Sequence, residues 1–252
     1  MRRLERLLIV PAAGTGSRLK STLPKLLVPV AGRAMIDHVL ALYAGIATRA
    51  AIVVQPSALA SVRQHLETAP MPLELLVQPA PTGMLDAIQL ARPAVERVRP
   101  RRVWITWCDQ IALHPATIAA LERADDAVPE PPLALPTCRR SDPYVHLDRD
   151  GDRITRVRHR REGDPMPDIG ETDAGLFDLS LGAYLHDLPS YAASPEIGAK
   201  TGERNFVPFV SWMSARGPVV TVACSSPEEA VGVNTPDELE RIEAHLRARA
   251  SR

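Results

Sequence analysis

The first half of the chain alternates short apolar runs with amphipathic stretches. Runs rich in aliphatic residues predict buried strands at Leu7–Val10, Ala51–Val54, Leu73–Val77 and Val103–Trp107. Apolar positions at helical spacing predict helices between them, at Met35–Ile46, Leu59–Glu67, Gly83–Val98 and His114–Ala124. Pro93 is expected to disturb the third helix, because proline removes a hydrogen bond inside a helix. This order of strands and helices predicts a mostly parallel sheet covered on both faces.

Shorter elements are expected after Leu133. Two strands, Tyr144–Leu147 and Arg153–Val157, flank the turn sequence Asp150-Gly151-Asp152, which predicts a β-hairpin. Further elements are expected as strands at Leu176–Leu179 and Val219–Val222, and as a helix at Asn205–Arg216 that tolerates Pro208 in its first turn. Thr235, Pro236 and Glu238 form a capping box that starts a last helix. The proline-rich segment Val128–Pro136 predicts a hinge between the halves.

Composition narrows the class of protein. Of 252 residues, 45 % are hydrophobic and 24 % charged, which is typical of a globular domain with a sizeable core. The formal net charge is zero, which argues against a nucleic-acid or membrane partner. No apolar run approaches the roughly 20 residues of a membrane span, and the apolar start is too short for a secretion signal. The three cysteines show no metal or disulfide spacing, so a cytoplasmic location is expected.

A glycine turn follows the first predicted strand and carries the clearest chemical signal. The small residues Ala12, Ala13, Gly14 and Gly16 allow backbone N–H groups to approach an anion closely. Two cations follow, Arg18 and Lys25, at Ser17-Arg18 and Pro24-Lys25. The Lys-Ser/Thr pair of a Walker loop is absent, and Leu19 stands where a dinucleotide fingerprint needs a small residue. The turn therefore predicts a triphosphate site of another kind, although an ordinary tight turn is the alternative.

Two oxygen-bearing side chains are candidates for holding a metal. Asp109 follows the strand Val103–Trp107, and Asn234 precedes the last helix. Each has an alternative role as a turn or cap residue. Because ligands of parallel sheets sit beyond the carboxyl ends of the strands, Asp109 is expected beside the glycine turn. A carboxylate and an amide oxygen together suit Mg²⁺, which leaves its other positions to water and phosphates.

The segment Gln78–Gly83 lies between a predicted strand and helix. Gln78 offers one donor face and one acceptor face to the edge of a pyrimidine base. Gly83 permits close backbone approach. An ordinary proline-rich loop is the alternative interpretation.

These motifs resemble the signature of sugar-1-phosphate nucleotidylyltransferases, with Gly-x-Gly, Ser-Arg and Pro-Lys in order. The similarity is greatest to the uridylyltransferase domain of the bacterial N-acetylglucosamine-1-phosphate uridylyltransferase group. It extends almost end to end through Leu23-Pro24-Lys25, Ala31–Met35, Gln78–Gly83, Asp109, Gly175, Gly202-Glu203 and Gly232-Val233-Asn234. The resemblance implies a three-layer α/β/α Rossmann-like nucleotidyltransferase fold (GT-A-like) with a mixed, mostly parallel central sheet. It implies one domain over residues 1–252, with a nucleotide-binding half at about 1–127, an acceptor-binding half at about 128–230 and a C-terminal helix at 235–249.

The resemblance also implies roles for the site residues. Nucleotide binding falls to Ala12, Ala13, Gly14, Gly16, Gln78 and Gly83, catalysis to Arg18, Lys25 and Asp109, and Mg²⁺ binding to Asp109 and Asn234. Arg18 would cover the β,γ-phosphates, and Lys25 the α-phosphate or the attacking group. The expected partners are a nucleoside triphosphate, UTP or dTTP in preference to CTP or GTP, and a phosphorylated small-molecule acceptor. The sequence leaves open whether the protein forms a homo-oligomer.

The departures from the family pattern fall on the acceptor side. A basic residue, Arg158 or His159, replaces a glutamate after the hairpin, and Asp173 replaces an asparagine. We assign Arg158 and Asp173 to acceptor binding. Arg156, Arg158 and Arg160 alternate, so on a strand they would share one face, either as an anion site or as a solvated edge. Trp104 and Trp107 are expected in the core.

Three functions therefore stay open. The first is Mg²⁺-dependent transfer of a nucleotidyl group to a sugar 1-phosphate. The second is the same transfer to another phosphorylated acceptor, such as an alditol phosphate, a choline-like phosphate or a molybdopterin-type cofactor. The third is a non-catalytic sensor of nucleotide sugars.

Overall fold

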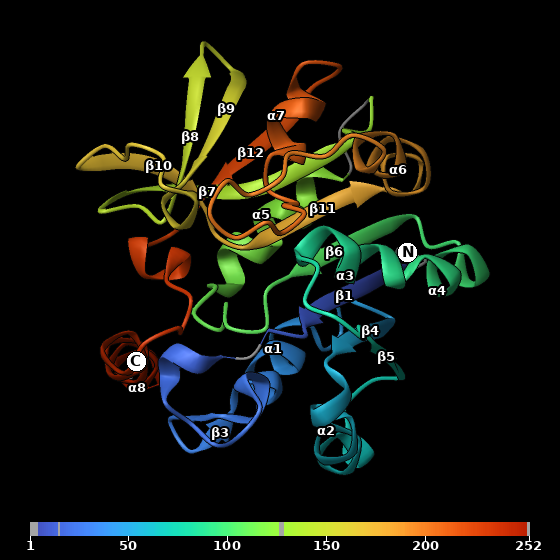
Figure 1. Ribbon diagram of the computed structural model, residues 1–252, viewed down its shortest axis with the longest axis vertical. Coiled ribbons are helices and arrows are strands. Elements are labelled where there is room, and N and C mark those ends of the chain that lie inside the picture. The colour runs from blue at the N-terminus through green and yellow to red at the C-terminus, as the bar shows by residue number, and fades with distance from the viewer. Residues whose placement is uncertain (1–4, 15, 126–128, 251–252) are drawn as a thin grey trace.

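A mixed eight-stranded sheet forms the middle layer of the computed structural model, which describes residues 5–14, 16–125 and 129–250 (Figure 1). Its strands are β1 (Arg6–Ala12), β4 (Arg49–Val54), β5 (Leu73–Val77), β6 (Arg102–Thr106), β7 (Leu133–Ser141), β10 (Ile169–Asp173), β11 (Leu176–Ser180) and β12 (Val219–Ala223). β5, β4, β1 and β6 are neighbours in this order and parallel, and β11 joins β6 antiparallel. β7 pairs with β11 and β10 antiparallel and with β12 parallel. The predicted mixed, mostly parallel sheet is confirmed.

Helices cover both faces of the sheet, as the sequence predicts. Side chains of β1 alternate between two hydrophobic clusters: Leu8 and Val10 belong to one, and Leu7 and Ile9 to the other. The first cluster is covered by α1 (Met35–Tyr43), α2 (Leu59–His65), α5 (Pro115–Ala124) and α8 (Pro236–Ala250). The second is covered by α3 (Met84–Leu90), α4 (Arg92–Val98), α6 (Leu188–Ala192), α7 (Phe209–Ser214) and the hairpin of β8 (Val145–Asp150) and β9 (Arg153–His159). The molecule thus has three layers.

Short elements complete the frame around the future site. The segment after β1 forms two 3₁₀ turns, η1 (Ser17–Leu19) and η2 (Lys25–Leu27), and the small ribbon β2 (Pro29–Val30) and β3 (Arg33–Ala34) follows. α8, at the end of the chain, lies beside this early segment (Figure 1), and Glu243 accepts a hydrogen bond of 2.6 Å from the Ala31 backbone. The last helix therefore packs beside the segment that follows β1.

Buried charges gather where β1 and β6 begin and the antiparallel β11 ends. Arg102 of β6 pairs with Asp178 of β11 at 2.6 Å, and Arg6 of β1 pairs with Asp125 at 2.7 Å. Burial raises the pKa of Asp178, and the neighbouring Asp125 raises it further against the attraction of Arg102. These contacts hold β1, β6 and β11 in register below the site.

The structure corrects several local predictions. The hinge predicted at Val128–Pro136 is wrong for Leu133–Pro136, which begin β7, whereas Val128 lies outside the described residues. Pro136 is tolerated because it lies between the part of β7 paired with β11 and the part paired with β10. The helix expected at Asn205–Arg216 covers only Phe209–Ser214. By contrast, the disturbance at Pro93 is confirmed, since α3 ends before Arg92 and α4 begins there.

The predicted arginine face is only partly present. Arg156 and Arg158 lie on β9, but Arg160 begins the 3₁₀ turn η5 (Arg160–Glu162), where strand alternation stops. Their carboxylate partners are Asp164, Asp148 and Asp142 respectively. Within the described segments, no helix combines the length and apolar character needed to cross a membrane.

Candidate active site

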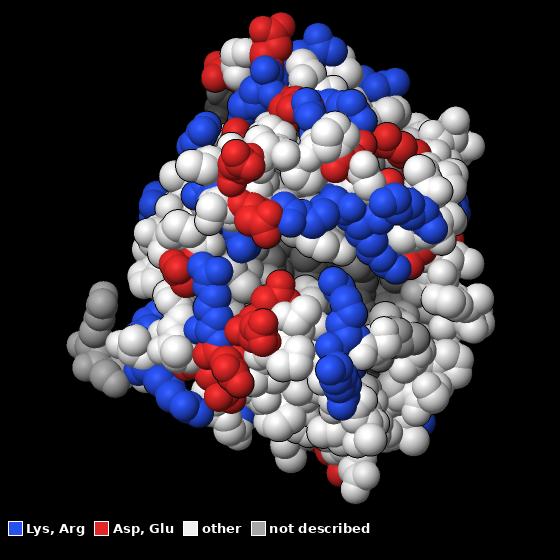
Figure 2. Space-filling model, turned by 60° about the vertical axis from the view of Figure 1, so that its left-hand side comes forward, with Lys and Arg blue, Asp and Glu red and all other residues white. Residues whose placement is uncertain are grey.

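A cavity of about 700 Å³ lies beyond the carboxyl ends of β1, β5 and β6. It is bordered by the glycine turn after β1, the loop after β5, the segment after β6, the hairpin β8–β9 and the start of α8. Basic and acidic side chains are interspersed around a recess on this side of the molecule (Figure 2). The position agrees with the expectation for parallel sheets, where ligands bind beyond the strand ends.

The glycine turn brings its two cations to this cavity. Gly16 has a φ of +62°, and a Cβ placed there would lie 2.8 Å from the Cβ of Lys25. Only glycine therefore permits both this backbone conformation and the close packing of η2 on the turn. Ala12, Ala13, Gly14, Gly16, Arg18 and Lys25 all line the cavity, whereas Thr15 lies outside the described residues.

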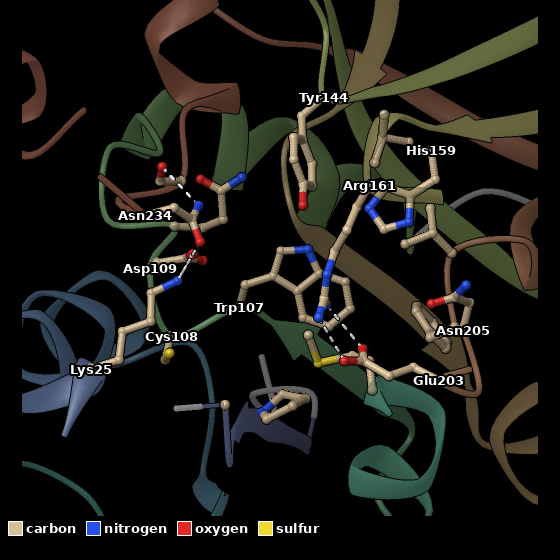
Figure 3. A pocket seen from close by; sticks show the side chains of 18 of the residues that line it. Lys25, Trp107, Cys108, Asp109, Tyr144, His159, Arg161, Glu203, Asn205 and Asn234 are labelled. Carbon is tan, nitrogen blue, oxygen red and sulfur yellow. Dashed lines mark hydrogen bonds and ion pairs between the residues drawn. The ribbon is translucent and has the colours of Figure 1, made fainter. Parts of the chain in front are cut away.

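The side chains of Asp109 and Asn234 meet at one end of the cavity. The ammonium of Lys25 donates to Asp109 Oδ2 and, at 2.7 Å, to Asn234 Oδ1 (Figure 3). Arg18 donates to the same Asn234 oxygen at 3.0 Å. Two oxygens from segments 125 residues apart therefore face a single positive charge.

Backbone contacts fix this convergence. The N–H of Val233 donates to the carbonyl of Asp109 at 3.2 Å, which lays the two segments side by side. Asn234 Nδ2 donates to the Gly232 carbonyl at 3.1 Å, so that Oδ1 is the end of the amide that faces Lys25 and Arg18. Glu238 accepts from the backbone N–H groups of Asn234 and Thr235, which confirms the predicted capping box of α8. The helix start thus holds Asn234 in position.

The electrostatics keep Lys25 charged. Burial lowers its pKa, but the attraction of Asp109 and their hydrogen bond outweigh burial and leave the pKa raised above the usual value. Burial also raises the pKa of the neighbouring Cys108 thiol to about 12, so that this group is neutral. Asp109 is 7 % exposed and is held by a neighbouring positive charge.

Asp109 and Asn234 fit a magnesium ion. Their oxygens already converge on one cation, and carboxylate and amide oxygens are the donors that Mg²⁺ prefers. In the described part of the chain, no group of three or more His, Cys, Asp or Glu side chains is placed to hold a metal. A site with two protein ligands leaves its other positions to water and phosphate oxygens.

The loop after β5 is closed by its own glutamine. Gln78 Nε2 donates to the Gly83 carbonyl at 3.0 Å and to Thr82 Oγ1 at 3.2 Å. The donor end of the side chain is therefore occupied, which leaves Oε1 as its acceptor. Gly83 has a φ of +120°, and its Cβ would lie 2.5 Å from the Arg204 carbonyl oxygen, so that only glycine fits. Both Gln78 and Gly83 line the cavity.

Aromatic and charged side chains form the other end of the cavity. In Figure 3, Tyr144, His159 and Arg161 lie on one side and Glu203 and Asn205 on another, with Trp107 between this group and Asp109. Arg161 donates two hydrogen bonds to Glu203, at 2.8 and 3.1 Å. His159 packs edge-on against Tyr144, and burial lowers its pKa. This end has the room and the polar groups to receive an acceptor.

The two residues assigned to acceptor binding differ in position. Asp173 lines the cavity and is 6 % exposed. Arg158 does not belong to the lining residues: it donates to Asp148 Oδ2 at 2.7 Å and to the Pro165 carbonyl at 3.1 Å. Strand alternation explains the difference, because Arg158 and His159 point to opposite faces of β9. The structure therefore places His159, not Arg158, at the cavity.

Other residues line the cavity although the sequence did not predict them there. Trp107, expected in the core, does pack on Phe177 and Phe206, but it also lines the cavity. Gln110 and Arg140 border the cavity too, and neither belongs to a recognisable motif. Gln110 could have been predicted from its position directly after Asp109, because residues that follow a buried parallel strand lie at the ligand-binding edge of the sheet.

Comparison with known proteins now decides the family. The model of the MobA-like NTP transferase domain matches residues 8–162. The chain belongs to this family. It is a nucleotidyltransferase, and the resemblance to sugar-1-phosphate nucleotidylyltransferases is confirmed by its relatives.

Curated relatives match almost the whole chain. The bifunctional protein GlmU of Xanthobacter autotrophicus is 33 % identical over 96 % of this chain and 53 % of its own length. GlmU of Stutzerimonas stutzeri is 30 % identical over 97 % of this chain and 53 % of its own length. The chain thus spans about half the length of the curated relatives it matches.

Solved structures support the fold. A putative glucose-1-phosphate thymidylyltransferase from Bacillus anthracis, in complex with a sucrose, has a TM-score of 0.73 and 18 % identity, and the match covers 96 % of this chain and 95 % of that one. The inositol-1-phosphate CTP transferase from T. maritima has a TM-score of 0.71 and 16 % identity, with 97 % of each chain covered. These similarities confirm the Rossmann-like nucleotidyltransferase fold.

Proposed function

We propose that this nucleotidyltransferase moves a nucleotidyl group from UTP or dTTP to a sugar 1-phosphate with the help of Mg²⁺. The proposal is supported chiefly by the convergence of Asp109 and Asn234 on the ammonium of Lys25, beside the glycine turn. The name of the glucose-1-phosphate thymidylyltransferase agrees with an acceptor that is a sugar phosphate.

The chemistry needs little covalent help from the protein. An oxygen of the acceptor phosphate attacks the α-phosphorus, a new P–O bond forms, and the bond to the leaving pyrophosphate breaks. The second pKa of a phosphate monoester is about 6, so the attacking group needs no dedicated base at neutral pH. Catalysis then consists of alignment and of neutralising crowded negative charge.

The basic side chains supply part of this neutralisation. Arg18 and Lys25 lie within hydrogen-bond distance of Asn234 and are the cations beside the glycine turn. Lys25 would donate to the α-phosphate or the attacking phosphate, and Arg18 to the leaving β,γ-phosphates. Because the pKa of Lys25 is raised, it stays positive throughout the neutral range.

Asp109 and Asn234 would hold the magnesium ion. When bound, Mg²⁺ supplies positive charge that offsets repulsion between the acceptor phosphate and the α-phosphate. Asp109 orients this site through its backbone bond to Val233, and Asn234 through the capped start of α8.

The loop after β5 favours a base with an N–H at its edge. Gln78 Nε2 is used within the loop, so Oε1 is the atom left for the base. Uracil and thymine donate a hydrogen bond from N3, whereas N3 of cytosine accepts one. This supports UTP or dTTP over CTP.

A pyrophosphate-release assay tests the proposal. The purified protein is incubated with each of UTP, dTTP, CTP and GTP, with Mg²⁺, and with a panel of sugar 1-phosphates, inositol 1-phosphate, alditol phosphates and choline phosphate. Products are identified by mass spectrometry. We expect release with UTP or dTTP and a sugar 1-phosphate, and no release in excess chelator. Turnover of only the non-sugar acceptors would assign the chain to that second class, and binding of nucleotide sugar without any turnover would make it a sensor.

A further inference from the structure

Gln110 is a buried polar residue that the proposed mechanism leaves unused. It directly follows Asp109 and lines the cavity, although only 5 % of its surface is exposed. Its backbone N–H donates to the Trp107 carbonyl at 3.2 Å, which fixes the turn after β6. Its side-chain Oε1 is buried and meets no hydrogen-bond donor anywhere in the described ranges.

An unpartnered buried oxygen lowers the stability of the folded protein. Such a group loses its hydrogen bonds to water on folding and gains nothing in return. Native proteins leave few of these groups, and those they keep often belong to functional sites. A leucine of similar size would fill the same space without this cost, so the amide is better explained by a ligand than by packing.

The backbone around Gln110 is shaped to keep it at the cavity. Gly175 has a φ of +66°, and a Cβ at this position would collide with the Gln110 side chain and with Trp107. The Trp107 N–H donates to the Gly175 carbonyl at 3.2 Å. Glycine is therefore required for the close approach of these two segments.

Asp173 reaches the same glycine from the other side. Its Oδ2 accepts a hydrogen bond of 2.9 Å from the Gly175 N–H. Among the described residues, no basic side chain forms an ion pair with this carboxylate, and burial raises its pKa to about 6. The basic side chains at this end have other partners, since Arg161 binds Glu203 and Arg160 binds Asp142. Two hydrogen-bond acceptors, from β10 and from the segment after β6, thus meet at Gly175, and both residues line the cavity.

We propose that Gln110 determines acceptor specificity and that, together with Asp173, it binds hydroxyl groups of the acceptor. This inference rests on the proposed function, which it deepens. Hydroxyl groups donate the hydrogen bond that the Gln110 oxygen lacks, and they can donate to the lone pairs of the Asp173 carboxylate that the Gly175 N–H leaves unused. A second anionic group would instead meet the Asp173 carboxylate without a compensating cation. The acceptor is therefore a polyhydroxylated compound that carries no anionic group besides its phosphate.

Steady-state kinetics of Gln110→Leu test the assignment. Leucine keeps the size of the side chain and removes its hydrogen-bonding atoms. We expect the acceptor KM to rise at least tenfold, because a site built to bind a hydroxyl loses this contact. The KM of the triphosphate is expected to stay within twofold of the wild type. Gln64→Leu, at an exposed glutamine of α2, is the matched control and leaves both constants unchanged.

Deoxy acceptors make the test specific for hydrogen bonding. The acceptor with the highest kcat/KM in the pyrophosphate-release panel is compared with its monodeoxy analogues. One analogue is expected to lose at least tenfold in kcat/KM with the wild type but less than threefold with Gln110→Leu, since the contact is already gone. The melting temperature of Gln110→Leu is expected to equal or exceed that of the wild type, because the variant removes an unpartnered buried atom.

The outcomes separate this inference from the proposed function. Wild-type turnover combined with an unchanged acceptor KM in Gln110→Leu would overturn the inference and leave the proposed function intact. A rise in both KM values with a lowered melting temperature would show a structural role instead, and also overturn it. If another phosphorylated acceptor is the substrate, the same comparison is made with its deoxy analogues. Absence of turnover with every acceptor rejects both proposals.

Discussion

Burial raises the pKa of Asp173 to about 6, although the Gly175 N–H donates a hydrogen bond to its carboxylate. The folded protein therefore binds this proton more tightly than the unfolded chain, whose aspartate has a pKa near 3.8. Stability falls as the pH rises from about 4 to about 6, and the full penalty is present above the folded pKa. A shift of about two units corresponds to about 2 to 3 kcal/mol.

Asp173→Asn tests this penalty. The asparagine keeps an oxygen for the Gly175 N–H but has no charge to bury. We expect Asp173→Asn to stabilise the protein relative to the wild type by about 2 to 3 kcal/mol more at pH 7.5 than at pH 4. Urea unfolding followed by circular dichroism at both pH values measures the difference. The exposed Asp152→Asn is the control, and an Asp173→Asn difference that does not change with pH would refute the burial argument.

Single residues differ in how far the sequence predicts them. Asp109 and Asn234 are predictable, because each follows an apolar run and strand ends gather at one sheet edge. The position of Arg158 away from the cavity lining is not predictable, because one step along a strand reverses the direction of a side chain and the sequence does not show which face meets the cavity. Gln110 has no signal of its own, since burial without a partner is visible only in the fold.

At the scale of elements, the loop Gln78–Gly83 depends on a segment far along the chain. The Arg204 N–H donates to the Thr82 carbonyl at 2.9 Å, and the Leu85 N–H donates to the Arg204 carbonyl at 3.2 Å. Arg204 also pairs with Asp86 in the first turn of α3. The neighbouring Glu203 pairs with Arg161, which follows the hairpin, so the segment Glu203–Arg204 contacts both the loop Gln78–Gly83 and the far end of the cavity.

Gly83→Ala is expected to disturb this contact. A Cβ at φ +120° is strained, and it would also press on the Arg204 backbone, so we expect a loss of about 1 to 3 kcal/mol of stability. The triphosphate should bind at least tenfold more weakly, because the loop that we propose to contact the base is displaced. Thermal unfolding and isothermal titration with UTP or dTTP measure the two effects. Gly217→Ala, where no positive φ or close neighbour opposes a Cβ, is the matched control; equal behaviour of the two variants would contradict the packing argument.

Elements with a clear hydrophobic pattern were predicted well, and those with mixed patterns were not. The strands β1, β4, β5 and β6 are parallel and largely apolar, which makes them visible in the sequence. β7 is not predictable from its sequence pattern, because Pro136 interrupts its apolar start and the charged Arg139 and Arg140 follow. Its identity as a strand depends on three partner strands that lie much later in the chain, so local pattern could not reveal it.

At the scale of the whole molecule, the sheet joins the two halves of the sequence. β11, from the second half, is inserted between β6 of the first half and β7. Both hydrophobic clusters include residues from the two halves, such as Leu8 with Ile242 and Ile9 with Phe177. Neither half can bury its apolar surface without the other.

We propose that the two halves form a single domain, which predicts one cooperative unfolding transition. Trp104 and Trp107 report on the first half and Trp212 on the second, so 5-fluorotryptophan NMR during urea unfolding gives a signal for each. We expect the three resonances to lose native intensity with the same midpoint, as two-state unfolding requires. Midpoints that differ between Trp212 and the other two would show separate domains.

The dependence of triphosphate binding on Mg²⁺ tests most directly whether Asp109 and Asn234 hold a metal for nucleotidyl transfer. The measurement is the shift in melting temperature caused by UTP or dTTP, with Mg²⁺ and with excess chelator, in the wild type and in Asp109→Ala. We predict a large shift for the wild type with Mg²⁺, and a small one in chelator or in the variant. An equally large shift in chelator, or a variant that responds to Mg²⁺ as the wild type does, would contradict the account.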